Sequence, residues 1–303
     1  MMRRFLSEDF MYGKMMIPLD GSKFAEGVLP YARRMAKGLG LPVDLLFVDD
    51  PVQPAGLAAS RASEYLQTIA ASFGSEAKIN ALVESGAAAA KIIEAAAAEP
   101  ELLIAMATHA YSGPKAWLLG SVAEKVLRAA PNHVLLVRPV DGQSQRAVEL
   151  TTVIAPLDGS QVAEKALPTL AELAKRLALG VTLVRVTRRI YSAPPEAFLP
   201  VFGANAPNLK QLWADANAEA NEYLSRIAEE LHRDGLAQVT PLVLEGGADG
   251  AAAAIIELSK NTPDSFLAMC SHGESGIGRW LVGSVTERVV RHGTAPVLVI
   301  RPE

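Results

Sequence analysis

Two copies of one stretch decide the fold: residues 14–48 read KMMIPLDGSKFAEGVLPYARRMAKGLGLPVDLLFV, and residues 152–186 read TVIAPLDGSQVAEKALPTLAELAKRLALGVTLVRV. A second match pairs AWLLGSVAEKVLRAAPNHVLLVRPV, residues 116–140, with RWLVGSVTERVVRHGTAPVLVIRP, residues 279–302. The first match is offset by 138 residues and the second by 163, so the second copy contains 25 additional residues. A repeat of this length indicates a duplicated domain rather than a solenoid unit.

The chain has 303 residues, which is enough to bury two separate hydrophobic cores. The polar segment DGQSQRAVEL, residues 141–150, has the composition of a linker. We therefore expect domain 1 over residues 1–146 and domain 2 over residues 147–303. The additional residues of domain 2 are expected at about 191–221, where a segment rich in Pro, Ala and Gly precedes a helical pattern.

Within each copy, short apolar runs alternate with helical patterns. In domain 1 we expect strands within MMIPL, VDLLFV, INALVE, ELLIAMAT and HVLLVRPV, with helices beginning at Ser22, Ser60, Ala87 and Ser121. This alternation predicts an α/β fold: in each copy an open, mostly parallel five-stranded sheet with helices on both faces and right-handed crossovers, Rossmann-like in outline. Ligands of such sheets bind beyond the carboxyl ends of the strands.

Bulk composition argues against several classes of function. A net charge of −4 and a pI near 5.8, without a long Lys/Arg run, give no positive field for nucleic acid. The single cysteine, Cys270, excludes an internal disulfide and suits a reducing compartment. Glu8 and Asp9 interrupt any signal peptide, and no apolar run is long enough to span a membrane. We expect a cytoplasmic protein without membrane or nucleic-acid partners.

The sharpest chemical signal follows the fourth strand of domain 2. The sequence MCSHGESGIGRWLVGSVTERVV spreads four glycines over a loop that ends at Gly283-Ser284, after which a helix is predicted. Glycines let backbone amides approach an anion, and a helix N-terminus adds unpaired N–H groups and a favourable dipole. Together these features predict a phosphate cradle, to which the Ser284 hydroxyl adds a donor.

At this loop the chain resembles the universal stress protein family, whose fold is of the adenine nucleotide alpha hydrolase type. Members that bind ATP carry Gly, two residues, Gly, nine residues, then Gly-Ser or Gly-Thr. Here Gly273, residues 274–282 and Gly283-Ser284 match that spacing, whereas Cys270 stands at the first glycine. The resemblance covers nearly all of both copies, including the Asp-Gly-Ser after the first strand and the closing Val-Arg-Pro or Ile-Arg-Pro.

The resemblance implies a site for ATP or AMP in domain 2, with Mg²⁺ or Mn²⁺ arriving on the phosphates. Asp158, after Pro156, and Val186 would hold the adenine and ribose side. The phosphate side would be lined by Met269, Cys270, Gly273, Gly283, Ser284 and Val285. The thiol of Cys270 adds bulk where the family's binders have none.

Domain 1 departs further from the family pattern. It keeps Asp20, Val48, Gly120 and Ser121, but Ala107 and Ala110 replace the two loop glycines. Alanine is strained wherever a loop needs a positive φ, so the resemblance implies a weaker or lost site in domain 1.

Simpler interpretations stand beside these. Asp20 and Asp158 suit a turn and a helix cap without any ligand, and both Gly-Ser pairs suit a plain helix start. His109 and His272 occupy matched positions, but no nucleophile or carboxylate pair completes a catalytic set around them. No metal-ligand cluster is encoded. We therefore expect no catalytic residues and at most a slow ATPase.

The closing strand of each copy is a candidate sheet edge, and in the family such strands pair across a twofold axis. We expect an internal pseudo-dimer of the two copies and a further homodimer, while the protein partner stays unknown. The alternative is a pair of edges guarded only by Arg138 and Arg301. The leading functional hypothesis is a nucleotide-responsive regulator or stress-resistance factor. Its rival is a dimeric interaction scaffold that has lost nucleotide binding.

Overall fold

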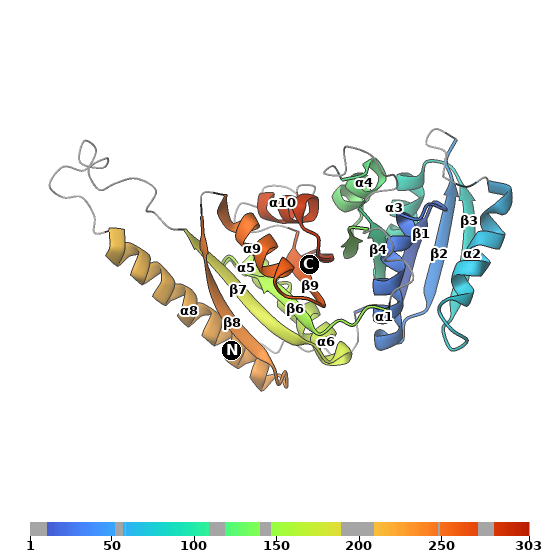
Figure 1. The fold of residues 1–303 in the computed structure, drawn as a ribbon. Helices are drawn as coiled ribbons and strands as arrows, with labels where there is room; N and C mark the ends of the chain where they lie inside the picture. The colour runs from blue at the N-terminus through green and yellow to red at the C-terminus, as the bar shows by residue number, and fades with distance from the viewer. Residues whose placement is uncertain are drawn as a thin grey trace, which may run out of the picture.

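The computed structural model describes residues 11–51, 57, 59–108, 119–139, 147–188, 209–247, 249–271 and 282–302. It contains one ten-stranded sheet with the order β3-β2-β1-β4-β5-β10-β9-β6-β7-β8 (Figure 1). All neighbouring strands are parallel except β5 and β10, which are antiparallel. The α/β fold with tandem copies of a mostly parallel sheet is therefore confirmed, and the two sheets are joined into one.

Domain 1 supplies the first five strands and the helices that connect them. Its strands are β1 (Lys14–Leu19), β2 (Val43–Asp49), β3 (Ile79–Ser85), β4 (Leu102–Ala107) and β5 (Val134–Val137). Its helices are the 3₁₀ turns η1 (Ala25–Val28) and η2 (Ala59–Arg61) and the α-helices α1 (Leu29–Leu39), α2 (Ala62–Ala71), α3 (Ala88–Ala98) and α4 (Ser121–Ala129).

Domain 2 repeats this order. Its strands are β6 (Thr152–Pro156), β7 (Gly180–Arg188), β8 (Val239–Gly246), β9 (Ser265–Cys270) and β10 (Val297–Ile300). Its helices are α5 (Gln161–Glu164), α6 (Leu167–Leu177), α8 (Leu209–Arg233), α9 (Gly250–Lys260) and α10 (Ser284–His292).

The helix expected from Ser22 begins later than predicted. A 3₁₀ turn, η1, precedes α1, which carries Pro30 in its first turn. Proline has no N–H to donate and is tolerated only at a helix start, so it favours a new helix there rather than one continuous segment. Domain 2 breaks at the equivalent place, where α6 follows α5 and carries Pro168 in its first turn.

Two layers of helices bury the two faces of the sheet. On one face α1, α2, α5, α6 and α8 contribute to a core that includes Leu29, Leu66, Leu167 and Leu224. On the other face α3, α4, α9 and α10 pack around a second core. Both cores run through both domains. The described strands therefore lie between two layers of helices.

The domains meet through their last strands, β5 and β10, as predicted from the sequence. Val297, Leu298 and Val299 of β10 face Leu136, Leu135 and Val134 of β5. Arg138 donates to the backbone oxygen of Arg291, and Arg301 donates to the backbone oxygen of Leu127. Each arginine therefore binds the C-terminal end of the other domain's helix, where a cation complements the helix dipole, instead of merely guarding an unpaired edge.

Much of the predicted insertion lies outside the described residues, which resume at Leu209 with α8. Buried Ala62 and Leu66 of α2 correspond to buried Ala220 and Leu224 of α8, so α8 extends about three turns further toward its N-terminus. In the part of the chain that the structure describes, no helix has the length and apolarity needed to cross a membrane.

Candidate functional site

A cavity of about 380 Å³ opens at the carboxyl ends of the domain 2 strands. This size lies within the range of small-molecule sites, about 300–1,000 Å³. Eight residues predicted from the sequence line it: Pro156, Asp158, Val186, Met269, Cys270, Gly283, Ser284 and Val285. The ninth, Gly273, lies outside the described residues, as do His109, Ala110 and His272.

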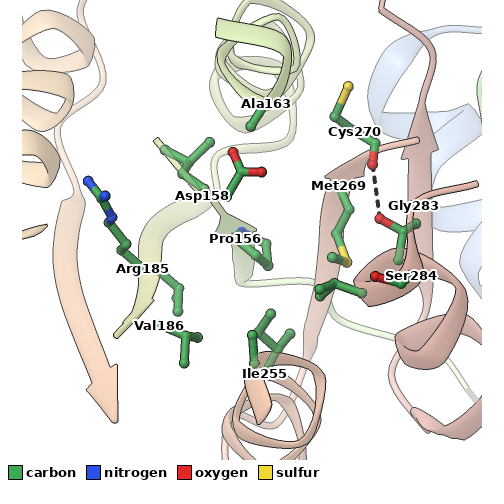
Figure 2. Close-up of a pocket in the computed structure, with 15 residues that line it drawn as sticks. Pro156, Asp158, Ala163, Arg185, Val186, Ile255, Met269, Cys270, Gly283 and Ser284 are labelled. Carbon is green, nitrogen blue, oxygen red and sulfur yellow. Dashed lines mark hydrogen bonds between the residues drawn. The ribbon is translucent and has the colours of Figure 1, made fainter. Parts of the chain in front are cut away.

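Three strands and three helices, α5, α9 and α10, contribute residues to this cavity. β6 contributes Pro156, β7 contributes Val186, and β9 ends in Met269 and Cys270. The first turn of α10 closes one side and Ile255 of α9 lies below (Figure 2). The sheet order places β6 between β7 and β9, which is why strand ends that are distant in sequence form one wall.

The α10 side of the cavity has the structure of an anion site. Gly283 is extended, with φ −58° and ψ 145°, and α10 begins at Ser284 directly after it. Its amide donates to the backbone oxygen of Ser271 at 2.6 Å, which anchors the helix start to the end of β9. The first N–H groups of such a helix lack intrahelical partners and carry the positive end of the dipole. This side can hold a phosphate.

Asp158 forms a turn of its own at the opposite side. Its Oδ1 accepts from the Ser160 amide at 2.9 Å and from the Ser160 hydroxyl at 2.6 Å. Ser160 Oγ in turn accepts from the Ala163 amide at 3.1 Å and caps α5. The local structure is therefore the turn and helix cap of the simpler interpretation. The same turn places Asp158 in the cavity wall.

Seven further wall residues were missed by sequence reasoning: Leu157, Ala163, Val184, Arg185, Ala251, Ile255 and Thr286. The α9 residues carry no motif, and their position depends on the packing of α9 beside α10. Thr286 is buried and donates to the backbone oxygen of Cys270 at 3.0 Å, a bond that ties α10 to β9. The signal in the sequence that points to it is the repeat, since domain 1 has Ala123 at this position.

A half-buried tyrosine of α8 packs against Arg185 of the cavity wall. Tyr223 of α8 lies under the guanidinium groups of Arg185 and Arg226, with Cζ atoms 5.1 and 5.4 Å from its ring centroid. Burial, together with the nearby carboxylate of Glu164, raises the pKa of Tyr223 far above its ordinary value, so this phenol stays protonated. It is a packing and hydrogen-bonding group, not an acid or base.

Domain 1 arranges its predicted residues in the same order and buries two of them, Val48 and Ala107, whereas Ser121 is exposed. Asp20 accepts from the Ser22 amide at 2.9 Å, Val48 and Ala107 are buried, and α4 begins at Ser121 after an extended Gly120. A Cβ placed on Gly21 would lie 2.5 Å from the Cβ of Leu57, so that side chain packs on the turn. Among the described residues, Leu57 thus lies against the Asp20-Gly21-Ser22 turn of domain 1.

The first turn of α3 in domain 1 is also satisfied internally. Buried Asp50 accepts from the Ala88 amide at 2.9 Å through Oδ2 and so caps α3 with its own negative charge. Domain 2 has Arg188 in place of Asp50, and α9 has no side-chain cap. The start of α9 has a carboxylate residue of its own, Asp249, at the N-cap position.

No group of three or more His, Cys, Asp or Glu side chains suited to a metal ion occurs within the described ranges. A divalent cation at this site would accordingly depend on ligand phosphates for most of its coordination.

Comparison with known proteins gives a consistent result. The model of the universal stress protein family matches the chain twice, over residues 11–138 and 149–301. The chain is 31% identical over 149 residues to Universal stress protein MJ0531 of Methanocaldococcus jannaschii, which covers 49% of this chain and 81% of that protein.

Solved structures agree on the fold. A universal stress protein from Archaeoglobus fulgidus matches with a TM-score of 0.71 at 21% identity, covering 97% of this chain and 100% of that one. A putative universal stress protein from Pseudomonas aeruginosa matches with a TM-score of 0.67 at 16% identity, covering 97% and 95%. At these identities the likeness concerns the two-domain architecture alone.

Proposed function

Because the chain belongs to the universal stress protein family, we propose that domain 2 binds an adenine nucleotide, ATP or AMP, and that domain 1 has a structural role. The observation that carries the proposal is the convergence of eight sequence-predicted residues on one cavity of about 380 Å³. Phosphates would lie against Gly283, Ser284 and Val285, and the base and ribose between Asp158 and Val186. Mg²⁺ or Mn²⁺ would enter with the phosphates.

Binding without efficient turnover follows from the wall chemistry. Phosphoryl transfer needs several cations around the phosphates and a positioned base or water. On the α10 side the described wall offers the hydroxyls of Ser284 and Thr286, and Thr286 already donates to a backbone oxygen. We therefore propose a nucleotide-responsive regulator with at most slow ATP hydrolysis.

A regulatory role would use the contact between the domains. A ligand that orders the start of α10 acts on a helix whose far end binds Arg138 of domain 1. Arg291 of α10 also pairs with Glu124 of α4, Nη2 to Oε1 at 3.4 Å. Nucleotide binding in domain 2 could thereby change the stability of the pseudo-dimer, or of a homodimer, in the cytoplasm.

One observation favours the rival scaffold. Cys270 lines the cavity at the place of a glycine in the family's motif, and only 7% of it is exposed. If this side chain excludes the phosphates, domain 2 is as closed as domain 1 and the protein acts only through its surfaces.

Calorimetric titration of ATP and AMP, each with Mg²⁺, into the full chain tests the proposal beside two variants, Gly283→Val and Gly120→Val. Both glycines have nearly the same backbone angles, φ −58° and ψ 145° against φ −60° and ψ 147°, so the substitutions stress folding alike. We expect one nucleotide per chain, lost in Gly283→Val and kept in Gly120→Val. No binding to the folded parent would overturn the proposal and leave the scaffold.

A further inference from the structure

Arg185 is the basic side chain of the cavity wall to which the proposed function gives no role. Within the described wall it is the one cation and Asp158 the one anion. Figure 2 shows Arg185 and Gly283-Ser284 on opposite sides, with Met269 and Ile255 between them. The cavity therefore has a polar group at each end and an apolar middle.

The guanidinium of Arg185 lies on the turn that presents Asp158. A Cβ placed on Gly159 would be 3.1 Å from Nη1 and 3.2 Å from Nη2, and Gly159 has a φ of +87°. Both terminal nitrogens therefore lie against the Asp158-Gly159-Ser160 turn, and only glycine leaves them room. This puts the positive charge on the side of the cavity where the ribose is expected.

The contacts of the Arg185 guanidinium occupy only some of its N–H donors. Cζ lies 5.1 Å from the centroid of the Tyr223 ring, within the range of a cation–π contact. Glu219 is its ion-pair partner among the described residues, at 3.7 Å from Nη2, and the Glu219 side chain is 75% exposed. Such a pair is weak, and a guanidinium has five N–H donors. Donors therefore remain for a ligand.

Domain 1 shows that the fold does not need a cation here. Phe47 occupies the equivalent register, since β2 and β7 pair alike with β1 and β6, and it is fully buried. Placing a partly buried guanidinium where an aromatic ring packs well costs desolvation. A ligand group that binds the guanidinium would offset that cost.

We infer that Arg185 makes domain 2 selective for adenine nucleotides that carry a second phosphate on the ribose. The inference rests on the proposed function. Guanidinium and phosphate match in charge and geometry, often through two parallel hydrogen bonds. Dinucleotide sites use the same pair of residue types: an acidic residue holds a free ribose hydroxyl, and a nearby arginine holds a ribose phosphate. Asp158 and Arg185 supply both on one turn.

Calorimetric titration of the full chain with AMP, adenosine 3′,5′-bisphosphate and adenosine 2′,5′-bisphosphate tests this selectivity. We expect one of the bisphosphates to bind about tenfold more tightly than AMP, as one charge-assisted contact allows. Arg185→Gln should remove the preference, measured as the ratio of the bisphosphate affinity to the AMP affinity.

Arg226→Gln is the matched control. It removes the same charge beside the same Tyr223 ring, but Arg226 pairs with Glu164 and Glu230 and does not line the cavity. It should keep the preference, and an equal loss in both variants would overturn the inference in favour of a general charge effect. AMP binding without any preference would overturn the inference alone. No nucleotide binding at all would overturn the proposed function and the inference with it.

Discussion

Domain 1 and domain 2 share strand order, helix order and core, but they treat the carboxyl ends of their strands differently. In domain 1, Leu57 covers the Asp-Gly-Ser turn, Asp50 caps α3, and Phe47 fills the second strand. In domain 2 Asp158 and Arg185 line a cavity, and Arg185 stands at the position of the phenylalanine. Helices and strands alone thus do not make a site. A site requires that the protein leave its own polar groups and volume unfilled.

The largest expected effect on the free energy of unfolding comes from exchanging the side chains at two matched positions, Phe47 of domain 1 and Arg185 of domain 2. Phe47→Arg places a charge at a fully buried position of domain 1, and we expect it to lower the free energy of unfolding by more than about 3 kcal/mol. Arg185→Phe should change the free energy of unfolding by about 1 kcal/mol or less, because its guanidinium already lies against an aromatic ring. Urea unfolding measures the free energy of unfolding of both variants. Equal decreases in the two would contradict the difference drawn between these positions.

A half-buried histidine in domain 1 predicts a pH dependence that the equivalent position of domain 2 does not share. His133 Nδ1 lies 2.7 Å from the Tyr12 hydroxyl, and its Nε2 lies 3.3 Å from the backbone oxygen of Arg301. Burial lowers the pKa of His133 to about 4. Below the ordinary histidine pKa near 6.5, His133 is protonated in the unfolded chain but stays neutral in the folded chain. The contribution of His133 to the free energy of unfolding is therefore constant above about pH 6.5. The free energy of unfolding falls by about 3 kcal/mol as the pH drops toward 4.

Chemical unfolding at a series of pH values tests this prediction in the parent and in His133→Gln. The slope between pH 4 and 6.5 should be shallower in the variant, since Gln cannot titrate. Domain 2 has Pro296 at the equivalent position and offers no such group. An unchanged slope would assign the acid sensitivity to other residues.

The contact between α1 and α6 predicts a moderate effect. A Cβ on Gly38 would lie 2.4 Å from Leu177 Cδ2 and 2.8 Å from Arg34 Nη1. Gly38→Val therefore forces these side chains apart at the domain boundary, and we expect a loss of about 2 kcal/mol in unfolding free energy. Exposed Arg176 of α6 occupies the position that matches Gly38 in the repeat. Arg176→Val therefore serves as the control and should cost less than about 0.5 kcal/mol. Equal losses would show that the helix surfaces are not specifically packed.

The smallest effect is expected where the domains are most symmetric. Glu124 and Arg128 of α4 and Glu287 and Arg291 of α10 form two ion pairs within the helices, at 3.1 and 2.9 Å, and two between them, at 3.4 and 3.8 Å. The side chains are 21–43% exposed, so solvent screens them. A double-mutant cycle with Glu124→Gln and Arg291→Gln should give a coupling below about 1 kcal/mol. A larger coupling would make this network a principal link between the domains.

The repeat made most of the fold predictable. Alternating apolar runs and helical patterns identified the five strands of domain 1, and the shared closing strands indicated where the copies pair. Eight residues that the family resemblance implied line one cavity, because strand ends in a parallel sheet meet at one edge.

The rest depended on side chains that meet only in three dimensions. The position of Leu57 over Gly21 could not be inferred, since nothing in the spacing says which way that side chain packs. Arg185 reads as one polar residue in a strand until Tyr223 and Gly159 are placed beside it. Arg138 and Arg301 were considered only as guards of an open edge, whereas each binds a carbonyl of the opposite domain.

The most direct test of the central claim, that domain 2 alone is an open nucleotide site, is hydrogen exchange on the full chain with and without saturating ATP and Mg²⁺. The backbone amides at the start of α10, residues 283–286, should become protected, and those at the start of α4, residues 120–123, should exchange as before. Protection at the start of α4 alone, or equal protection at both helix starts, would contradict the claim that the two domains differ in this way.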